Sequence, residues 1–167
     1  MTASIDRRNN SSTYLLGVVP RFGYYIGGFM HRDLVSDQVS FRLDATMQMK
    51  GVGSEYNGRA TVKASYYYLG LSPQIGLRFS EQFSVWLGAE ANRLLSSVHA
   101  WGKTYPFEFG GLARLSYQIG QFGLETSYCK GFTKYDSLET ISLPGGPSTN
   151  DFYNQTIQLG IFYRLGL

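Results

Sequence analysis

Twelve consecutive residues, from Val39 to Lys50, alternate without error between apolar and polar side chains. The apolar members are Val39, Phe41, Leu43, Ala45, Met47 and Met49, and the polar members are Ser40, Arg42, Asp44, Thr46, Gln48 and Lys50. A period of two predicts a β-strand with two unlike faces. The apolar face of a soluble sheet turns inward, whereas that of a membrane barrel turns outward into lipid. The chain's other strands must decide between these two orientations.

The same alternation recurs, less regularly, along the rest of the chain, and no segment has a convincing 3.6-residue period. Between residues 60 and 80 the alternation changes phase, which predicts a β-bulge near Tyr68 and Leu69. The whole chain, residues 1–167, is therefore expected to form a single all-β domain. Its further strands are expected near residues 21–32, 60–80, 83–92, 107–119, 122–129 and 157–167.

The connections between these segments alternate in length. Short turns are expected near Asp33–Gln38, Ser80–Gln82 and Gly120–Gln121, and longer polar loops near Gly53–Arg59, Ser96–Tyr105 and Asp136–Phe152. An antiparallel up-and-down meander with one plain end and one elaborated end produces this order. Outer-membrane barrels have short turns at one end and longer loops at the other.

The first strand allows two readings. In one, residues 12–19 form strand one, the chain turns at Pro20 and Arg21, and residues 22–32 form strand two. In the other, residues 14–32 form one long strand preceded by a loop at 6–13, and most of strand one would lie before Met1. Because bacterial barrels of this kind close with an even number of strands, an eight-stranded transmembrane β-barrel is expected.

Composition limits the other possibilities. The chain is 43% hydrophobic but only 16% charged, with 13 Tyr, 11 Phe and 20 Gly, which suits a β-protein. A net charge of +3 without a large basic cluster makes nucleic acid a poor partner. The single cysteine, Cys129, cannot form an intrachain disulfide and is expected to be a small buried residue.

The charged residues on the polar face favour the membrane orientation. If the apolar face pointed inward, its many Phe and Tyr rings would overfill an eight-stranded barrel, whose interior is only just wide enough for side chains. With the faces reversed, both signs of charge can pair inside, and inward glycines leave room for them. The expected lumen charge network is Arg42, Asp44, Lys63, Arg78, Glu90, Glu108, Arg114, Glu125 and Arg164.

Aromatic residues on the apolar face fall at two levels. Phe107 and Tyr117 are ten residues apart on one strand, and ten residues of a tilted strand rise roughly 25 Å, the height of a lipid-facing band. Two interfacial girdles are therefore expected. The lipid-facing and girdle residues are Phe41, Tyr66, Phe79, Phe83, Phe107, Tyr117, Phe122 and Tyr163.

Two stretches also resemble a known family. "GQFGLETSYCKGFTKYDSL" and the terminal "TIQLGIFYRLGL" resemble the porin-like, PorT-like outer-membrane β-barrel proteins of Bacteroidetes, as does "YYYLGLSPQIGLRFSEQFSVWLGAEANRLL". The last strand is also similar to the signal read by the barrel-assembly machinery, except that Leu167 stands where Phe is usual. The resemblance implies a β-barrel in the bacterial outer membrane, in contact with lipid or lipopolysaccharide.

Little in the sequence suggests catalysis. The only local Ser/His/acid set is Ser96, Ser97 and His99 with Glu90, and the two histidines, His31 and His99, are expected at opposite ends of the barrel. No cofactor, metal site or enzyme activity is predicted. The function expected is structural or adhesive, or that of an accessory subunit bound to other outer-membrane proteins. A soluble lipocalin-like barrel with an apolar ligand is the alternative, and a lipid-modifying barrel enzyme is a third possibility.

Overall fold

The chain folds into a single antiparallel β-sheet. The computed structural model describes residues 2–7, 17–36, 38–56, 59–100, 102–142 and 146–165, and the side chains of 21–34, 38–53, 63–100, 102–137 and 151–165. No helix in this part of the chain is long and apolar enough to cross a membrane. The strands are β1 (Thr2–Arg7), β2 (Gly17–Pro20), β3 (Tyr24–Ser36), β4 (Val39–Tyr56), β5 (Arg59–Arg78), β6 (Phe83–Val98), β7 (Lys103–Thr104), β8 (Phe107–Ile119), β9 (Phe122–Ser142) and β10 (Gly146–Tyr163).

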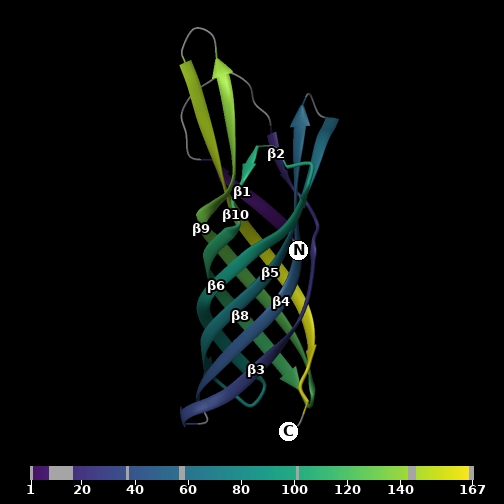
Figure 1. Cartoon of the computed structure of the whole chain (residues 1–167). Coiled ribbons are helices and arrows are strands. Elements are labelled where there is room, and N and C mark those ends of the chain that lie inside the picture. Colours follow the sequence, from purple (N-terminus) through teal and green to yellow (C-terminus); the bar gives the residue numbers. More distant parts are fainter. Residues whose placement is uncertain are drawn as a thin grey trace.

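Neighbouring strands run up and down in chain order, as the alternation of short and long connections predicted. The order across the sheet is β1-β10-β9-β8-β6-β5-β4-β2, with β3 also on β4 and the short β7 on β9. Figure 1 shows this sheet curling strongly around an interior, with hairpins at its upper end and short turns at its lower end. "Upper" and "lower" refer to these two ends below, and "lumen" to the space that the sheet curls around.

The opening stretch forms the best-paired part of the sheet. β4 pairs with β5 from Val39 opposite Leu77 to Tyr56 opposite Arg59, with one register shift at its upper end. The bulge predicted in residues 60–80 is displaced: Tyr67 pairs with Ser96 and Tyr68 with Leu94, so the extra residue is Leu95 in β6. β5 itself keeps one phase from Val62 to Arg78.

The second reading of the first strand agrees with the pairing. β2 lies opposite residues 52–55 of β4, and β3 continues along the same neighbour from Met49 downward, so that β2 and β3 form one interrupted strand line. A turn at Pro20 between two paired strands, as in the first reading, is therefore wrong. β1 is a separate strand that pairs with the upper part of β10, from Thr2 opposite Ile157 to Arg7 opposite Phe152. Most of the residues expected in the preceding loop, 8–13, lie outside the described ranges.

The three short turns are confirmed, but the longer connections are mostly strand. β4 and β5 extend to Tyr56 and Arg59, and β9 and β10 pair up to Ser142 opposite Gly146. The expected loop at 136–152 is therefore the upper part of a long hairpin, whose turn, 143–145, lies outside the described residues. Gly, Ser and polar residues near strand ends imitated a loop, although a ladder of backbone hydrogen bonds continues through them. These hairpins rise above the rest of the sheet (Figure 1).

The sheet does not close into a hydrogen-bonded barrel. In the described part of the chain, β3 pairs only with β4, and the lower part of β10, from Gln158 to Tyr163, pairs only with β9. These two edges are the ends of the curled sheet. The expected all-β, up-and-down arrangement is thus present, whereas the expected closure is not.

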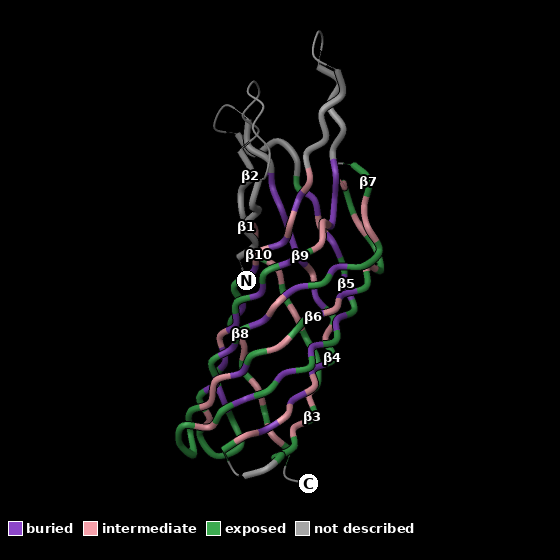
Figure 2. Tube along the Cα trace, turned by 90° about the vertical axis from the view of Figure 1, so that its left-hand side faces the viewer, coloured by how far each residue is buried: buried purple, intermediate pink, exposed green. Residues whose placement is uncertain are grey.

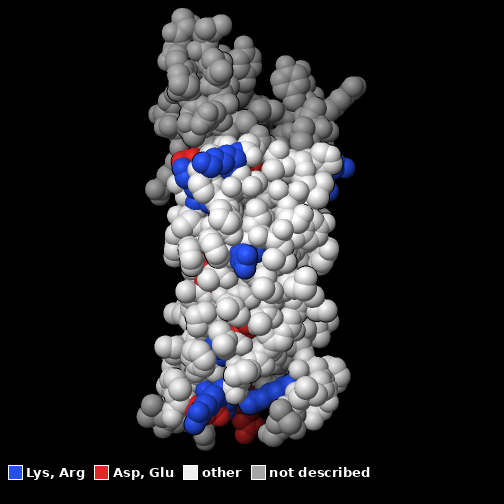
Figure 3. All heavy atoms as spheres, in the orientation of Figure 1, with Lys and Arg blue, Asp and Glu red and all other residues white. Residues whose placement is uncertain are grey.

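The two faces of the sheet differ in polarity in the orientation that the sequence favoured. Among the described side chains, nine hydrophobic residues are buried but nineteen polar or charged residues are, and most of the latter lie on the inner face. The outer face carries large exposed apolar side chains such as Leu71, Leu87 and Leu159. Figure 2 shows buried and exposed positions alternating along each strand, and Figure 3 shows charged atoms gathered mainly toward the two ends of the visible face, with one basic group near mid-height.

Candidate functional site

The lower half of the lumen holds a neutral cluster of four buried charges. Arg42 Nε donates to Asp44 Oδ1 at 2.6 Å, and Arg42 Nη2 lies 3.0 Å from Glu125 Oε2. Arg114 Nη1 lies 2.5 Å from Asp44 Oδ2 and 3.5 Å from Glu125 Oε2. Gln74 Nε2 also donates to Asp44, at 3.0 Å. Two guanidinium groups thus alternate with two carboxylates, which compensates the cost of burying all four.

Side chains from β4, β6, β8 and β10 meet at a second cluster, in the middle of the lumen. Lys50 Nζ donates to Glu108 Oε1 at 2.7 Å and to Glu90 Oε1 at 3.0 Å. Asn92 donates to both carboxylates, and Asn154 donates to Glu108. One ammonium and two amide groups therefore hold two neighbouring carboxylates.

The space between the clusters is filled by amides. Gln48 Nε2 donates to Asn92 Oδ1 at 3.2 Å, and Gln158 Nε2 donates to Gln48 Oε1 at 3.4 Å. These contacts cross the lumen between strands that are not neighbours in the sheet. The interior is therefore cross-linked by side chains, as well as lined by them.

An aromatic cluster caps the polar interior from above. It consists of Val52, Ala64, Tyr66, Tyr68, Tyr135 and Phe152. Tyr66 and Tyr135 meet edge to face at 5.1 Å between ring centroids, and the Tyr66 hydroxyl donates to Asp136 Oδ2 at 2.7 Å. The Lys50 ammonium lies 5.2 Å from the centroid of the Tyr68 ring, which joins this cap to the charges below it.

Two predicted positions are wrong, and both lie in the upper half of β5. Lys63 is exposed and does not belong to the interior network, while Tyr66, expected on the lipid-facing side, is only 2% exposed. Tyr66, Tyr68 and Ala64 share the inner face with Gln74 and Gly76 because β5 has no change of phase between Ala64 and Gly76. Tyrosine suits both faces of such a sheet, since it has an apolar ring and a hydroxyl that finds a partner when buried.

The other predicted residues lie on the expected faces. Arg42, Asp44, Glu90, Glu108, Arg114 and Glu125 are buried inside, and Arg78 and Arg164 lie partly exposed at the lower mouth. Phe41 is half-buried on the outer parity of β4. The remaining outer aromatic residues are all exposed: Phe79, Phe83, Phe107, Tyr117, Phe122 and Tyr163.

Sequence reasoning missed the amide and ammonium partners in the lumen. Lys50 was not included in the expected charge network, but it is 2% exposed and central to its cluster. Asn92, Asn154 and Gln158 were not singled out because amides carry no charge pattern. Only their position in the alternation could have indicated them, since each lies on the polar face of its strand.

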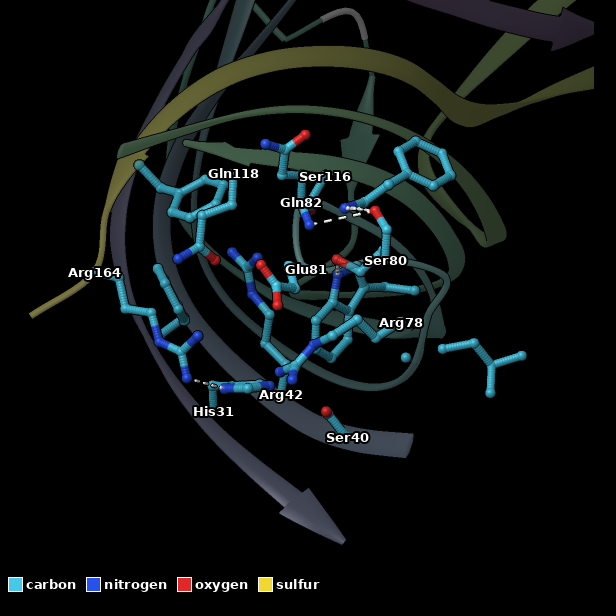
Figure 4. A pocket seen from close by; sticks show the side chains of 17 residues that line it. His31, Ser40, Arg42, Arg78, Ser80, Glu81, Gln82, Ser116, Gln118 and Arg164 are labelled. Atoms are coloured by element: carbon cyan, nitrogen blue, oxygen red, sulfur yellow. Dashed lines mark hydrogen bonds between the residues drawn. The ribbon is translucent and has the colours of Figure 1, made fainter. Parts of the chain in front are cut away.

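A pocket opens at the lower mouth of the lumen (Figure 4). Its basic side chains are Arg42, Arg78, Arg164 and His31. Its wall includes Phe29 on the unpaired edge strand β3 and Phe162 on the other edge strand, β10. Arg164 Nη2 lies 2.9 Å from His31 Nδ1. Arg42 is stacked 4.1 Å from the centroid of the Phe29 ring. The pocket therefore receives side chains from both unpaired sheet edges as well as from β4, β5, β6 and β8.

The sequence analysis expected the inward glycines to leave room for charged side chains. Several of them instead leave room for aromatic rings. A Cβ on Gly76 would collide with the Trp86 ring, and one on Gly123 would collide with Phe162. A Cβ on Gly160 would collide with the Tyr25 hydroxyl. That hydroxyl donates to Glu125 Oε1 at 3.3 Å. These contacts bring the large inner side chains of β3 and β10 into the lower lumen.

At the upper rim a small, partly exposed cluster lies outside the lumen. Lys134 Nζ lies 3.4 Å from Asp151 Oδ1 and 5.1 Å from the centroid of the Tyr105 ring. The Tyr105 hydroxyl shares a hydrogen bond with Ser137, which, with the Lys134 ammonium, lowers the pKa of the phenol. This rim carries both signs of charge in reach of solvent.

The candidate hydrolase set is not assembled. Glu90 is occupied by Lys50 and Asn92 inside the lumen, whereas His99 and Ser96 are exposed near the upper end of β6. His31 and His99 lie at opposite ends of the sheet. In the described part of the chain, no group of three His, Cys, Asp or Glu side chains is placed to hold a metal ion.

Comparison with known proteins adds no assignment. No family model matches the chain, and no curated protein matches it. The lumen's paired charges and amides are committed to one another, so the arrangement is suited to holding strands together.

Proposed function

We propose that the protein is a small outer-membrane β-barrel protein with a plugged polar lumen. Its role would be structural or adhesive, or that of an accessory subunit in a larger outer-membrane assembly. The observation that carries this proposal is the inverted polarity of the sheet, with charges paired inside and large apolar side chains outside. We also propose, from the resemblance of its strands, that the protein is related to the PorT-like proteins of Bacteroidetes.

The outer surface supports a lipid environment. Leu71, Ile75 and Leu77 follow one another on the outside of β5, each about half exposed or more, and Leu159 and Ile161 on β10 are 74% and 79% exposed. Soluble monomers rarely expose contiguous apolar patches larger than a few hundred Å². An apolar surface that continues over several neighbouring strands is the surface that a transmembrane barrel presents to lipid.

The interior supports a role other than conduction. Lys50 bridges two carboxylates in mid-lumen, the Arg42–Asp44–Arg114–Glu125 cluster fills the level below, and tyrosines cap the level above. An eight-stranded barrel is filled by its own side chains. The places left for partners are the upper hairpins, the upper rim around Lys134 and the apolar outer face, with lipid, lipopolysaccharide or another outer-membrane protein as the partner.

The alternatives have less support. A lipocalin-like binder of an apolar ligand needs an apolar cavity, whereas the buried set here is mainly polar. A lipid-modifying enzyme needs a nucleophile, a base and an acid together, and the sequence's only local candidates are apart.

The proposal is tested by refolding from urea in two solvents. We expect the chain to form β-structure in detergent micelles or phospholipid vesicles and to migrate differently on gels before and after heating, as folded outer-membrane barrels do. In plain buffer it should aggregate. A monodisperse, folded protein in buffer without detergent would overturn the proposal and favour the soluble alternative.

A further inference from the structure

The two unpaired edges of the sheet run in the same direction. Six antiparallel steps lead from β3 through β4, β5, β6, β8 and β9 to β10, and an even number of reversals leaves β3 and β10 parallel. Edges with this relation cannot be joined in an antiparallel meander. One added strand, antiparallel to both, would join them.

Part of such a strand is already in place. β1 runs antiparallel to β10, opposite residues 152–157, so it is antiparallel to β3 as well. It thus occupies the upper part of the line between the two edges. Below Thr2, the side of β10 from Gln158 to Tyr163 that faces away from β9 has no partner in the described chain.

Side chains already reach across this opening on the lumen side. The rings of Phe29 and Phe162 meet edge to face at 5.7 Å between centroids. Arg164 contacts His31, and Tyr25 reaches Glu125 over Gly160. On the outer face, the edge of β3 is bare at Gly28, which is exposed and where a Cβ would meet nothing within 4 Å. The opening is therefore braced from within and free on its outer side.

We propose that the opening between β3 and the lower part of β10 is an acceptor site for one further β-strand, antiparallel to both edges and collinear with β1. The occupant that fits is a polypeptide strand joined to the amino end of β1, because β1 already fills the upper part of the same line. A strand from a separate protein would have to end inside the sheet where β1 begins.

The register of β1 defines the chemistry of this occupant. Continued downward, it places the first, third and fifth residues before Met1 opposite Leu159, Ile161 and Tyr163, which are exposed outside. These three should be apolar. The second, fourth and sixth residues would lie opposite Gly160, Phe162 and Arg164, facing the lumen. The second and fourth residues must be small, because Tyr25 and Phe29 occupy the space that their side chains would enter. The sixth should be acidic, because it would lie beside Arg164.

The energetic argument for the occupant rests on the proposed membrane location. Backbone N–H and C=O groups that face lipid without a partner are strongly unfavourable, so open sheet edges do not occur in the hydrocarbon region. The described part of the chain has seven long strands, β3, β4, β5, β6, β8, β9 and β10, and an eighth gives the even number that closed bacterial barrels have.

The test compares three forms of the protein folded in phospholipid micelles. The first is the chain as it stands; the second carries Asp-Val-Ser-Leu-Gly-Val before Met1; the third carries the same residues in the opposite phase, Val-Asp-Leu-Ser-Val-Gly. Amide hydrogen exchange is followed by NMR at Phe29 and Ile161, whose N–H groups face the opening, with Leu115 in the central strand β8 as internal reference. We expect exchange at both edges to slow by more than about tenfold only in the second form.

A cross-link checks the register independently. With Cys129 replaced by Ala, a cysteine at the third residue before Met1 should form a disulfide with Ile161→Cys, and one at the second residue should not. The hexapeptide added as a free molecule should protect neither edge at equimolar concentration. If the free peptide protects both edges as well as the attached strand does, the site takes a strand from a separate polypeptide and our choice of occupant is wrong.

Failure of this inference is distinguishable from failure of the proposed function. If Leu115 is protected in micelles but the matched extension changes neither edge and forms no cross-link, the acceptor site is refuted while the membrane protein stands. If Leu115 is unprotected in micelles in all three forms, the proposed function fails instead.

Discussion

Arg114 Nη1 on β8 lies 2.5 Å from Asp44 Oδ2 on β4, so one ion pair ties together two strands that are not neighbours in the sheet. Both side chains are only 4% exposed. A contact of this kind resists flattening of the curled sheet, because its partners approach only when the sheet bends around them. The interior charges therefore act on the curvature of the sheet as well as on its stability.

Replacing Arg114 with Leu should destabilise the folded protein by about 3 to 5 kcal/mol, because Asp44 and Glu125 would each lose a cationic partner while buried. Urea titration of the protein in phospholipid vesicles measures this change. Arg93→Leu is the matched control, since Arg93 is exposed on the outer face. If the two substitutions lowered the free energy of unfolding equally, the interior ion pairs would contribute no more to stability than an exposed arginine does.

Replacing Leu71 with Arg tests the outer face. Leu71 is 52% exposed and lies opposite Ala45 and Ala91, well inside the apolar band. Arg near the bilayer midplane of a barrel costs about 2 to 4 kcal/mol, and about 0 to 1 kcal/mol near the interface. Phe79→Arg, at the lower turn, should therefore cost much less than Leu71→Arg when unfolding is measured in vesicles. A soluble protein would tolerate both changes alike.

How far the sequence predicted this molecule depends on which residues carried the pattern. From Val39 to Lys50 every second residue is polar, so the strand and the inward face of Arg42 and Asp44 could be predicted directly, although their particular partners could not. In β5 the run Tyr66–Tyr68 carries no such contrast, because tyrosine is compatible with either face, and the predicted phase was wrong there. The hairpins near residues 53–59 and 136–152 resembled loops because Gly, Ser and other polar residues interrupt the alternation there, although backbone pairing between the strands continues. The amide contacts of Gln48 with Asn92 and Gln158 depend on curvature, which no local pattern records.

Replacing Tyr66 with Phe tests the aromatic cap. The Tyr66 hydroxyl donates to Asp136 at 2.7 Å in a buried site, so its removal takes a donor from a buried carboxylate. The free energy of unfolding should fall by about 1 to 3 kcal/mol. Tyr67→Phe, one residue along and on the outer face, is the matched control and should change stability little. The comparison is made by urea titration, and a larger effect at Tyr67 would contradict the inward placement of Tyr66.

Labelling of Cys129 distinguishes a packed lumen from an aqueous pore. Its thiol is the only one in the chain and is 5% exposed, on the inner face of β9 beside the Lys50–Glu90 cluster. In the folded protein a charged, water-soluble maleimide should react with it at least about a hundredfold more slowly than after unfolding, because thiolate chemistry requires access.

Two variants in a Cys129→Ala background serve as references: Gln82→Cys in the exposed lower turn should react rapidly, and Leu124→Cys on the outer face should react rapidly in micelles only with an apolar maleimide. Rapid labelling of Cys129 itself by the charged reagent, with Lys50 and Glu90 intact, would mean that water and ions reach mid-lumen. The interior would then serve passage through the barrel, and the plugged-lumen proposal would have to be abandoned.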